Sequence, residues 1–180
     1  WDERKKYVTA ALEAGADGAT VSSGDVNNAK KLGNIKIISD SEESDVLYLE
    51  ADTPQTVEEA ISRAEAEENK KVAISVRITG KEMEEAAVKA GKIADFLVTI
   101  AENWKVIPLE NLISKLQDSK AEILAGVKSS EEAKTAVETL EVGSDGVLLD
   151  PREKGMDEIR KTCETLEELG SERFELVSAK

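Results

Sequence analysis

Histidine is absent from this 180-residue sequence, and cysteine occurs once. Without histidine the chain cannot form a Ser-His-Asp or Cys-His catalytic group, or a histidine-rich zinc site, from its own residues. A single cysteine cannot form an internal disulfide. Cys163 falls on one helical stripe with three apolar residues, Met156, Ile159 and Leu166. This stripe predicts a buried structural cysteine rather than a nucleophile. Acid–base chemistry must therefore rely on Asp, Glu, Lys or Tyr.

Long apolar runs and an excess of basic residues are also missing. No segment approaches the roughly 20 apolar residues of a membrane span, and none resembles a signal peptide. The net charge is −14, from 38 acidic and 24 basic residues, and such a surface repels the phosphates of nucleic acids and lipids. We therefore expect a cytoplasmic protein without nucleic-acid or membrane partners. The Gly-x-Gly-x-x-Gly and Walker patterns are absent too, so the sequence shows no nucleotide site of its own.

Short apolar runs alternate with helical patterns along the chain, which predicts an α/β fold with a mostly parallel sheet. We predict seven strands, at 19–22, 35–38, 46–49, 72–78, 96–100, 122–127 and 147–149. We predict helices at 2–14, 25–32, 56–68, 81–91, 108–117, 130–140 and 155–169. Only the acidic run 40–45 separates the second strand from the third. It has no metal-ligand spacing, so we interpret it as a solvated loop and expect no metal site.

Seven strands are one short of a closed eight-stranded barrel, and the chain starts at Trp1 with a helix. We therefore expect a TIM-like (β/α) barrel over residues 1–170 that lacks its first strand. The open edge predicts association with another copy, as a homo-oligomer. Residues 173–177 alternate like a strand after the last helix, so residues 171–180 are expected to begin a truncated carboxyl-terminal domain.

Two helix–strand joints repeat almost letter for letter. They are Glu-Ala-Gly-Ala-Asp-Gly-Ala at 13–19 and Glu-Val-Gly-Ser-Asp-Gly-Val at 141–147, and 89–96 is a weaker copy. In each joint we expect the first glycine to take the left-handed conformation that ends a helix. Such joints lie at the amino-terminal face of a barrel, which supports stability rather than catalysis.

The segment 103–113, Asn-Trp-Lys-Val-Ile-Pro-Leu-Glu-Asn-Leu-Ile, places chemical groups where barrel enzymes keep them. It follows the strand at 96–100, and active sites lie on the loops at the carboxyl ends of strands. Glu110 and Asn111 follow a proline at the start of a helix. A first-turn proline and glutamate are also ordinary helix-starting devices, so a structural role is equally open. Lys105 in the same segment is a candidate ligand for an anion, or a solvated loop charge.

Two more cations lie at carboxyl ends of predicted strands. Lys128 follows the run at 122–127, where its amine could form a Schiff base or hold a carboxylate. The alternative is an ordinary surface lysine. Arg77 suits an anionic ligand, and it could equally pair with a neighbouring acid. The serines that follow Lys128 predict a helix cap whose amide groups could receive an anion, although two glutamates oppose that.

Several segments, taken together, resemble the 3-dehydroquinate synthase II family of archaeal type. They are Trp-Asp-Glu-Arg-Lys-Lys at 1–6, Gly-Asn-Ile at 33–35, residues 104–113, Ala-Gly-Val-Lys-Ser-Ser-Glu-Glu-Ala at 125–133, and Gly-Ser-Asp-Gly-Val-Leu-Leu at 143–149. The stretch Ile-Pro-Leu-Glu-Asn-Leu-Ile at 107–113 is the most specific part. The Gly-x-Asp-Gly joint is common among barrel enzymes.

The resemblance implies an oxidoreductase of aromatic amino-acid synthesis. In that family, NAD-dependent oxidative deamination and cyclisation convert an amino keto sugar acid, 2-amino-3,7-dideoxy-D-threo-hept-6-ulosonate, into 3-dehydroquinate. The family also has a further carboxyl-terminal domain. On this basis we predict catalytic roles for Glu110, Lys128 and Asn111 and substrate binding by Arg77 and Lys105. We place no NAD contact. Two alternatives stay open: a Schiff-base lyase or aldolase on a TIM barrel, and a non-catalytic interaction domain.

Overall fold

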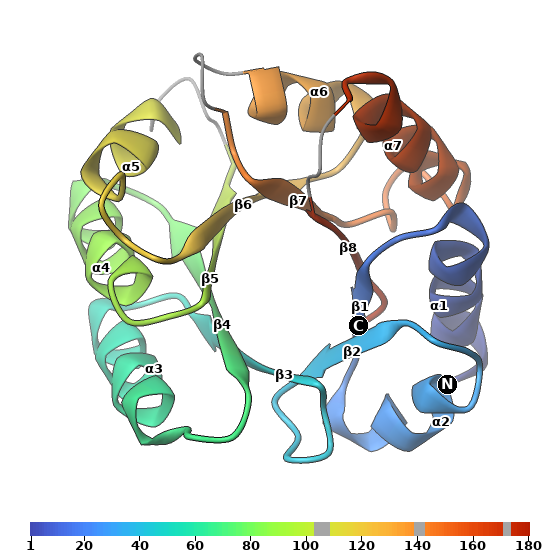
Figure 1. The fold of residues 1–180 in the computed structure, drawn as a ribbon, viewed down its shortest axis with the longest axis horizontal. Helices are drawn as coiled ribbons and strands as arrows, with labels where there is room; N and C mark the ends of the chain where they lie inside the picture. Colours follow the sequence, from blue (N-terminus) through green and yellow to red (C-terminus); the bar gives the residue numbers. More distant parts are fainter. Residues whose placement is uncertain (103–108, 139–142, 171–173) are drawn as a thin grey trace.

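The computed structural model describes residues 1–102, 109–138, 143–170 and 174–180. Among these residues, eight parallel strands follow one another in chain order around a closed barrel, and the helices surround it (Figure 1). The predicted TIM-like α/β barrel is therefore confirmed. The strands are β1 (Gly18–Thr20), β2 (Lys36–Ser39), β3 (Val46–Ala51), β4 (Lys71–Ile78), β5 (Phe96–Ala101), β6 (Glu122–Val127), β7 (Gly146–Leu149) and β8 (Phe174–Ser178). The helices are α1 (Asp2–Ala14), the 3-10 turn η1 (Ser23–Asp25), α2 (Val26–Lys30), α3 (Pro54–Ala66), α4 (Lys81–Gly91), α5 (Leu109–Lys115), α6 (Ser130–Glu138) and α7 (Asp157–Glu168).

The eighth strand is the segment that we expected to lie outside the barrel. Leu176 of β8 pairs with Leu148 of β7 on one side and with Gly18 of β1 on the other. The expected gap is therefore wrong for the described residues, because β8 fills it. The sequence pattern did not show this, since strand alternation alone does not reveal the neighbouring strands. The homo-oligomer and the further domain stay predictions, and the open edge no longer supports the former.

Both faces of the sheet are buried. Inside the barrel lies one apolar cluster, formed by Ile38, Val46, Tyr48, Ala73, Phe96, Val98, Leu124, Leu148 and Leu176. A second, larger cluster fills the space between the strands and the helices. In β3, for example, Val46 and Tyr48 belong to the inner cluster while Leu47 and Leu49 belong to the outer one. This double burial explains why the strands are continuous apolar runs.

Strands β2 and β3 are joined by the acidic run 40–45 rather than by a helix, and this loop lies on the outside of the barrel between α2 and α3 (Figure 1). Parallel neighbours usually need a crossover of about a dozen residues. Here the end of β2 is level with the start of β3, because Ile38 pairs with Val46. The stagger between the two strands therefore permits the short connection.

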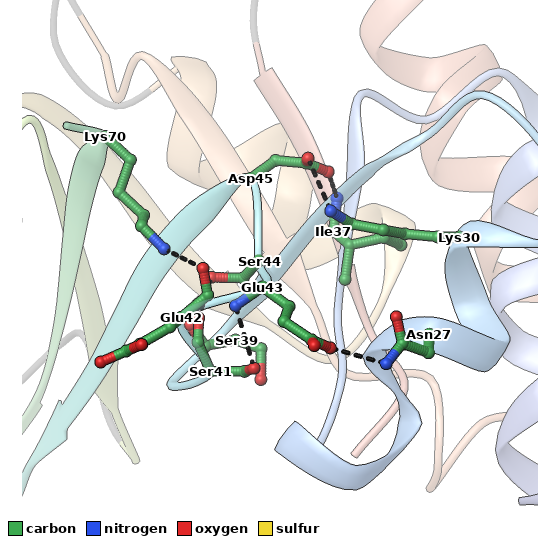
Figure 2. Close-up of polar contacts among 10 residues, drawn as sticks. All are labelled: Asn27, Lys30, Ile37, Ser39, Ser41, Glu42, Glu43, Ser44, Asp45 and Lys70. Atoms are coloured by element: carbon green, nitrogen blue, oxygen red, sulfur yellow. Dashed lines mark hydrogen bonds and ion pairs between the residues drawn. The ribbon is translucent and has the colours of Figure 1, made fainter.

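The loop is tied to its neighbours (Figure 2). Its anchors are Asn27 Nδ2 to Glu43 Oε2 at 2.6 Å, Lys30 Nζ to Asp45 Oδ1 at 3.3 Å, and Lys70 Nζ to the Glu42 carbonyl at 2.5 Å. Within the loop, the Ser44 hydroxyl donates to the carbonyls of Ser39 and Ser41. The acidic run is thus an ordered loop, held by hydrogen bonds and an ion pair, that takes the place of a crossover helix. No group of acidic, histidine or cysteine residues suited to a metal occurs in the described part of the chain.

Four aspartates in the described part of the chain bind the amino-terminal end of the sheet in the same way. Each precedes an odd-numbered strand, and its carboxylate accepts the backbone N–H of an even-numbered neighbour. The pairs are Asp17 with Glu175 of β8 at 2.8 Å, Asp45 with Ile37 of β2 at 2.7 Å, Asp95 with Val72 of β4 at 2.8 Å, and Asp145 with Ile123 of β6 at 2.7 Å. In each pair the aspartate N–H also donates to the carbonyl of the same partner. We call these four aspartates the aspartate clamps.

The glycines of the repeated joints divide into two kinds. Gly15 and Gly143 have φ of +84° and +64°, so the left-handed conformation predicted for them is confirmed. Gly91 of the weaker copy is instead the last residue of α4, and the prediction is wrong there. A Cβ on Gly91 would lie 2.7 Å from Leu116 Cδ1. That glycine is therefore favoured by close packing against leucine side chains rather than by a turn.

Candidate active site

The carboxyl-terminal end of the barrel has charged side chains where the amino-terminal end has the aspartate clamps. Arg77 lies at this end of β4 and is exposed. Lys128 follows β6 and Asp150 follows β7; both strands are in register, with Val127 opposite Leu149. Glu50 of β3 and Lys180, which follows β8, lie at the same end. We call this end of the barrel the mouth.

Lys128 is held by two glutamates. Its Nζ lies 2.7 Å from Glu153 Oε1, and its backbone N–H donates to Glu132 Oε2 at 2.8 Å. The hydrogen bond to Glu153 and its negative charge raise the pKa of Lys128. The side chain is therefore an ammonium in this arrangement. An ammonium can hold a carboxylate, whereas a Schiff-base lysine must first lose its proton.

A second ion pair lies beside Lys128. Arg152 donates from Nε and Nη2 to the two carboxylate oxygens of Asp150, at 2.8 and 2.5 Å. These hydrogen bonds lower the pKa of Asp150, and the nearby Lys128 adds to the effect. Asp150 is therefore a stable carboxylate and unsuited to donate a proton near neutral pH. The sequence did not reveal this network, because Glu153 is just one of many acidic residues in the chain.

The amino terminus of α6 faces the same end of the barrel. Side chains of this protein accept hydrogen bonds from its backbone N–H groups. Ser129 Oγ accepts the Glu132 N–H at 3.2 Å. The carboxylate of Glu158, which comes from α7 and is only 8% exposed, accepts from Ser130 N at 2.9 Å and from Ser130 Oγ at 3.1 Å. The backbone hydrogen bond from Ser130 lowers the pKa of Glu158, so this carboxylate is ionised. The helix terminus that could have received a phosphate is thus occupied by a buried carboxylate.

The predicted residues lie at one end of the barrel but do not form one cluster. Glu110 and Asn111 lie in the first turn of α5, after β5, and both are exposed. Among the four candidates that the structure describes, no hydrogen bond or ion pair joins one to another. Lys105 lies outside the described residues. The roles proposed for all five residues stay predictions.

No helix in the described ranges is long and apolar enough to cross a membrane.

A closed parallel barrel with charged groups at the carboxyl ends of its strands is the architecture of TIM-barrel enzymes, whose active sites lie at that end. The chain thus has the framework of this class.

Comparison with known proteins defines the family. Residues 1–166 match the model of the 3-dehydroquinate synthase II N-terminal domain. The chain is 38% identical to a 3-dehydroquinate synthase of Methanothermobacter thermautotrophicus, over 99% of the chain and 50% of that relative. It is 41% identical to the enzyme of that name from Methanosphaera stadtmanae, over 99% of the chain and 48% of the relative. It is 36% identical to the 3-dehydroquinate synthase of Haloarcula marismortui, over 98% of the chain and 50% of that relative. The chain therefore belongs to the 3-dehydroquinate synthase II family.

The chain spans about half the length of the curated relatives that it matches. No solved structure shows a significant match to it.

Proposed function

We propose that the protein to which this chain belongs is an NAD-dependent 3-dehydroquinate synthase of the second type. It would convert 2-amino-3,7-dideoxy-D-threo-hept-6-ulosonate into 3-dehydroquinate, in the shikimate route to aromatic amino acids. The overall balance is substrate, water and NAD in, and 3-dehydroquinate, ammonium, NADH and a proton out. The observation that carries this proposal is the family match over residues 1–166, together with relatives that bear the name 3-dehydroquinate synthase.

The mouth has cations that suit a substrate carboxylate, and one helix terminus beside it is closed to phosphate. Lys128 is a protonated ammonium, and Arg77 is an exposed guanidinium at the same end of the barrel. Either suits a carboxylate. In contrast, the carboxylate of Glu158 occupies the amino terminus of α6. A free helix amino terminus can bind a phosphate, whereas this one would repel the anion.

In this proposal the chain's own residues bind the substrate and move protons. Lys128 and Arg77 hold its carboxylate, and Lys105 assists. Glu110 is the base that accepts a proton in the dehydrogenation or in ring closure, because it is a carboxylate in an exposed first turn at the mouth. Asn111, next to it, supplies an amide for hydrogen bonds to substrate hydroxyls.

The amino termini of α3 and α6 do not fit a dinucleotide. A diphosphate is usually held by a glycine-rich turn and free amide groups at a helix amino terminus. Here Glu158 and Ser129 satisfy the amide groups of α6, and a Thr53–Thr56 capping box satisfies those of α3. We therefore assign NAD to no residue of this chain, and the roles above involve only the substrate.

The test is an assay of the protein at its natural length. Incubation with the amino heptulosonate and NAD should produce NADH and 3-dehydroquinate in equal amounts. The ordinary phosphorylated heptulosonate is the control, and it should give no product. Formation of 3-dehydroquinate from the phosphorylated compound alone would contradict the proposal.

A Schiff-base lyase is the second candidate, and Lys128 is its natural nucleophile. The ion pair with Glu153 disfavours it, because a raised pKa keeps the amine protonated. Borohydride treatment with substrate should therefore leave Lys128 unmodified. A covalent adduct on this residue would favour the lyase. If Lys128→Ala and Glu110→Gln both kept the protein's cellular role intact, a non-catalytic interaction domain would be favoured instead.

A further inference from the structure

An aromatic ring and a carboxylate hold an internal ammonium group at one side of the mouth. The Lys180 Nζ lies 4.9 Å from the centre of the Tyr48 ring and 2.9 Å from Glu50 Oε2. Tyr48 is 2% exposed and belongs to the apolar cluster inside the barrel. The ring is therefore fixed in place. An ammonium over an aromatic face, with a carboxylate beside it, is the arrangement that proteins use to recognise organic cations.

The same three residues line a cavity of about 290 Å³. Its other walls include Asp40, which follows β2, and the α3 residues Thr56, Glu59 and Arg63. The cavity lies along the side of α3 that faces β2, where the connection between β2 and β3 is a loop instead of a helix. Its lining includes three carboxylates and two cations. The lining suits a polar ligand with a positive charge.

We propose that the face of Tyr48 and the carboxylate of Glu50 form a binding site for the primary ammonium group of a small polyhydroxylated ligand. Lys180 occupies this site as an internal stand-in. Its hold is weak enough to be displaced, because it consists of one ion pair and one ring contact at the end of a flexible stem. A ligand ammonium would replace the lysine Nζ, and the hydroxyl groups of the ligand would meet Asp40 and Glu59.

The proposed substrate has an amino group and hydroxyl groups, so its assignment to this site rests on the proposed function. The site would then hold the amine while Arg77 and Lys128 hold the carboxylate. The ammonium site itself rests only on the geometry of Tyr48, Glu50 and Lys180. The two claims can therefore be tested separately.

The test uses glucamine, a linear primary amino polyol, and sorbitol, its neutral counterpart. Binding to the protein at its natural length is measured by calorimetry and by the NMR signals of the Tyr48 ring. Glucamine should bind and shift those signals, and sorbitol should do neither. Lys180→Met should bind glucamine about 10-fold more tightly, because the competing internal ammonium is gone.

Two matched variants in the Lys180→Met background locate the site. Glu50→Gln should weaken glucamine binding about 10-fold or more, while Glu59→Gln, which removes a carboxylate from the same cavity, should have a smaller effect. Both residues are exposed, so neither change should unfold the barrel. If both variants lost the same amount of glucamine affinity, binding would come from the acidic surface as a whole, and the proposal would be overturned. So would failure of Lys180→Met to bind glucamine, or equal binding of sorbitol.

These outcomes are independent of turnover. If glucamine binds as described but the protein makes no 3-dehydroquinate, the proposed function fails and the ammonium site stands. If the enzyme is active but glucamine does not bind, the ammonium site is wrong and the proposed function stands.

Discussion

The two ends of the barrel use carboxylates in different ways. At the amino-terminal end the aspartate clamps accept backbone N–H groups of neighbouring strands, at 2.7 to 2.8 Å. At the mouth, Glu132 and Glu158 also accept backbone N–H groups, but other carboxylates pair with side chains. In the Lys128–Glu153 contact the partners are 53% and 65% exposed. A backbone partner cannot leave without breaking the sheet, whereas a lysine can turn away at little cost. One end is therefore built for stability, and the other has charges that a ligand can recruit.

The clamps also show that half of the strands share one device. Asp17, Asp45, Asp95 and Asp145 precede β1, β3, β5 and β7, and each holds an even-numbered strand. Asp45 does so although a short loop replaces the helix before it. The device thus depends on the position of an aspartate before a strand and not on the preceding helix.

The largest expected effect is at the mouth. In the protein at its natural length, Lys128→Ala and Glu110→Gln should each lower turnover by about 100-fold or more, because one removes a cation that binds substrate and the other a proton acceptor. The melting temperature should change little, since both side chains are exposed. Steady-state kinetics and thermal unfolding measure the two effects.

The opposite result would contradict the assignment of catalysis to the mouth and of stability to the amino-terminal end. If Asp145→Ala abolished turnover in a normally folded protein while Lys128→Ala and Glu110→Gln stayed active, the active site would lie at the amino-terminal end.

The second effect concerns an acid in the barrel wall. Glu175 of β8 is 5% exposed, and burial raises its pKa to about 7. Its neighbours are Asp17 and the Cys163 thiol. Cys163 is half-buried, whereas the sequence predicted a buried cysteine. The unfolded chain loses this proton near pH 4.5, whereas the folded protein keeps it up to about pH 7. The free energy of unfolding should therefore decrease as the pH rises from 4.5 to 7. The full penalty above pH 7 is on the order of 3 kcal/mol.

Glu175→Gln should remove this pH dependence and stabilise the protein at pH 8. Urea unfolding at pH 5 and pH 8 measures the change. The variant serves as the control for all other titrating groups. If the wild type and Glu175→Gln showed the same change in stability between pH 5 and pH 8, the raised pKa would not belong to Glu175.

A smaller effect is expected at a single clamp. Asp145→Ala should lower the free energy of unfolding by about 2 kcal/mol, because the Ile123 N–H loses its partner at 2.7 Å. Asp145→Asn keeps an acceptor oxygen and should lose about half as much. Asp95→Ala should behave like Asp145→Ala, since it removes the same contact from Val72. Turnover should be nearly unchanged in all three variants, and a purely catalytic effect would refute the clamp role.

The smallest effect is expected at the amino terminus of α6. Glu158→Gln should cost about 1 kcal/mol at neutral pH. Because the pKa of Glu158 is lowered in the folded state, its stabilisation should be present above pH 4.5 and disappear as the pH falls further. The variant should also gain weak phosphate binding, seen as a phosphate-dependent rise in melting temperature that the wild type lacks. Phosphate stabilisation of the wild type alone would mean that Glu158 does not occupy the site.

Local sequence patterns predicted much of the fold. Helices α1 and α4 and strand β6 have the predicted bounds, because their periodicity and their ends are local properties. The left-handed Gly15 was predictable for the same reason. The site was less accessible. The sequence placed Lys128 and Arg77 at strand ends, but it could not show that Glu153 holds Lys128 or that Glu158, 28 residues away, reaches Ser130. Partners distant in sequence leave no local pattern.

The sequence by itself determined the alternation of helices and strands, the double burial of the strands and the end of the sheet at which charged groups gather. These follow from hydrophobic periodicity and from residue order. Only the tertiary structure decided that residues 174–178 close the barrel, that Asp45 is a clamp and that Lys180 lies on Tyr48. Each of these depends on closure of the sheet, which brings β8 beside β1 and the Lys180 side chain to β3, and closure is a property of the whole chain.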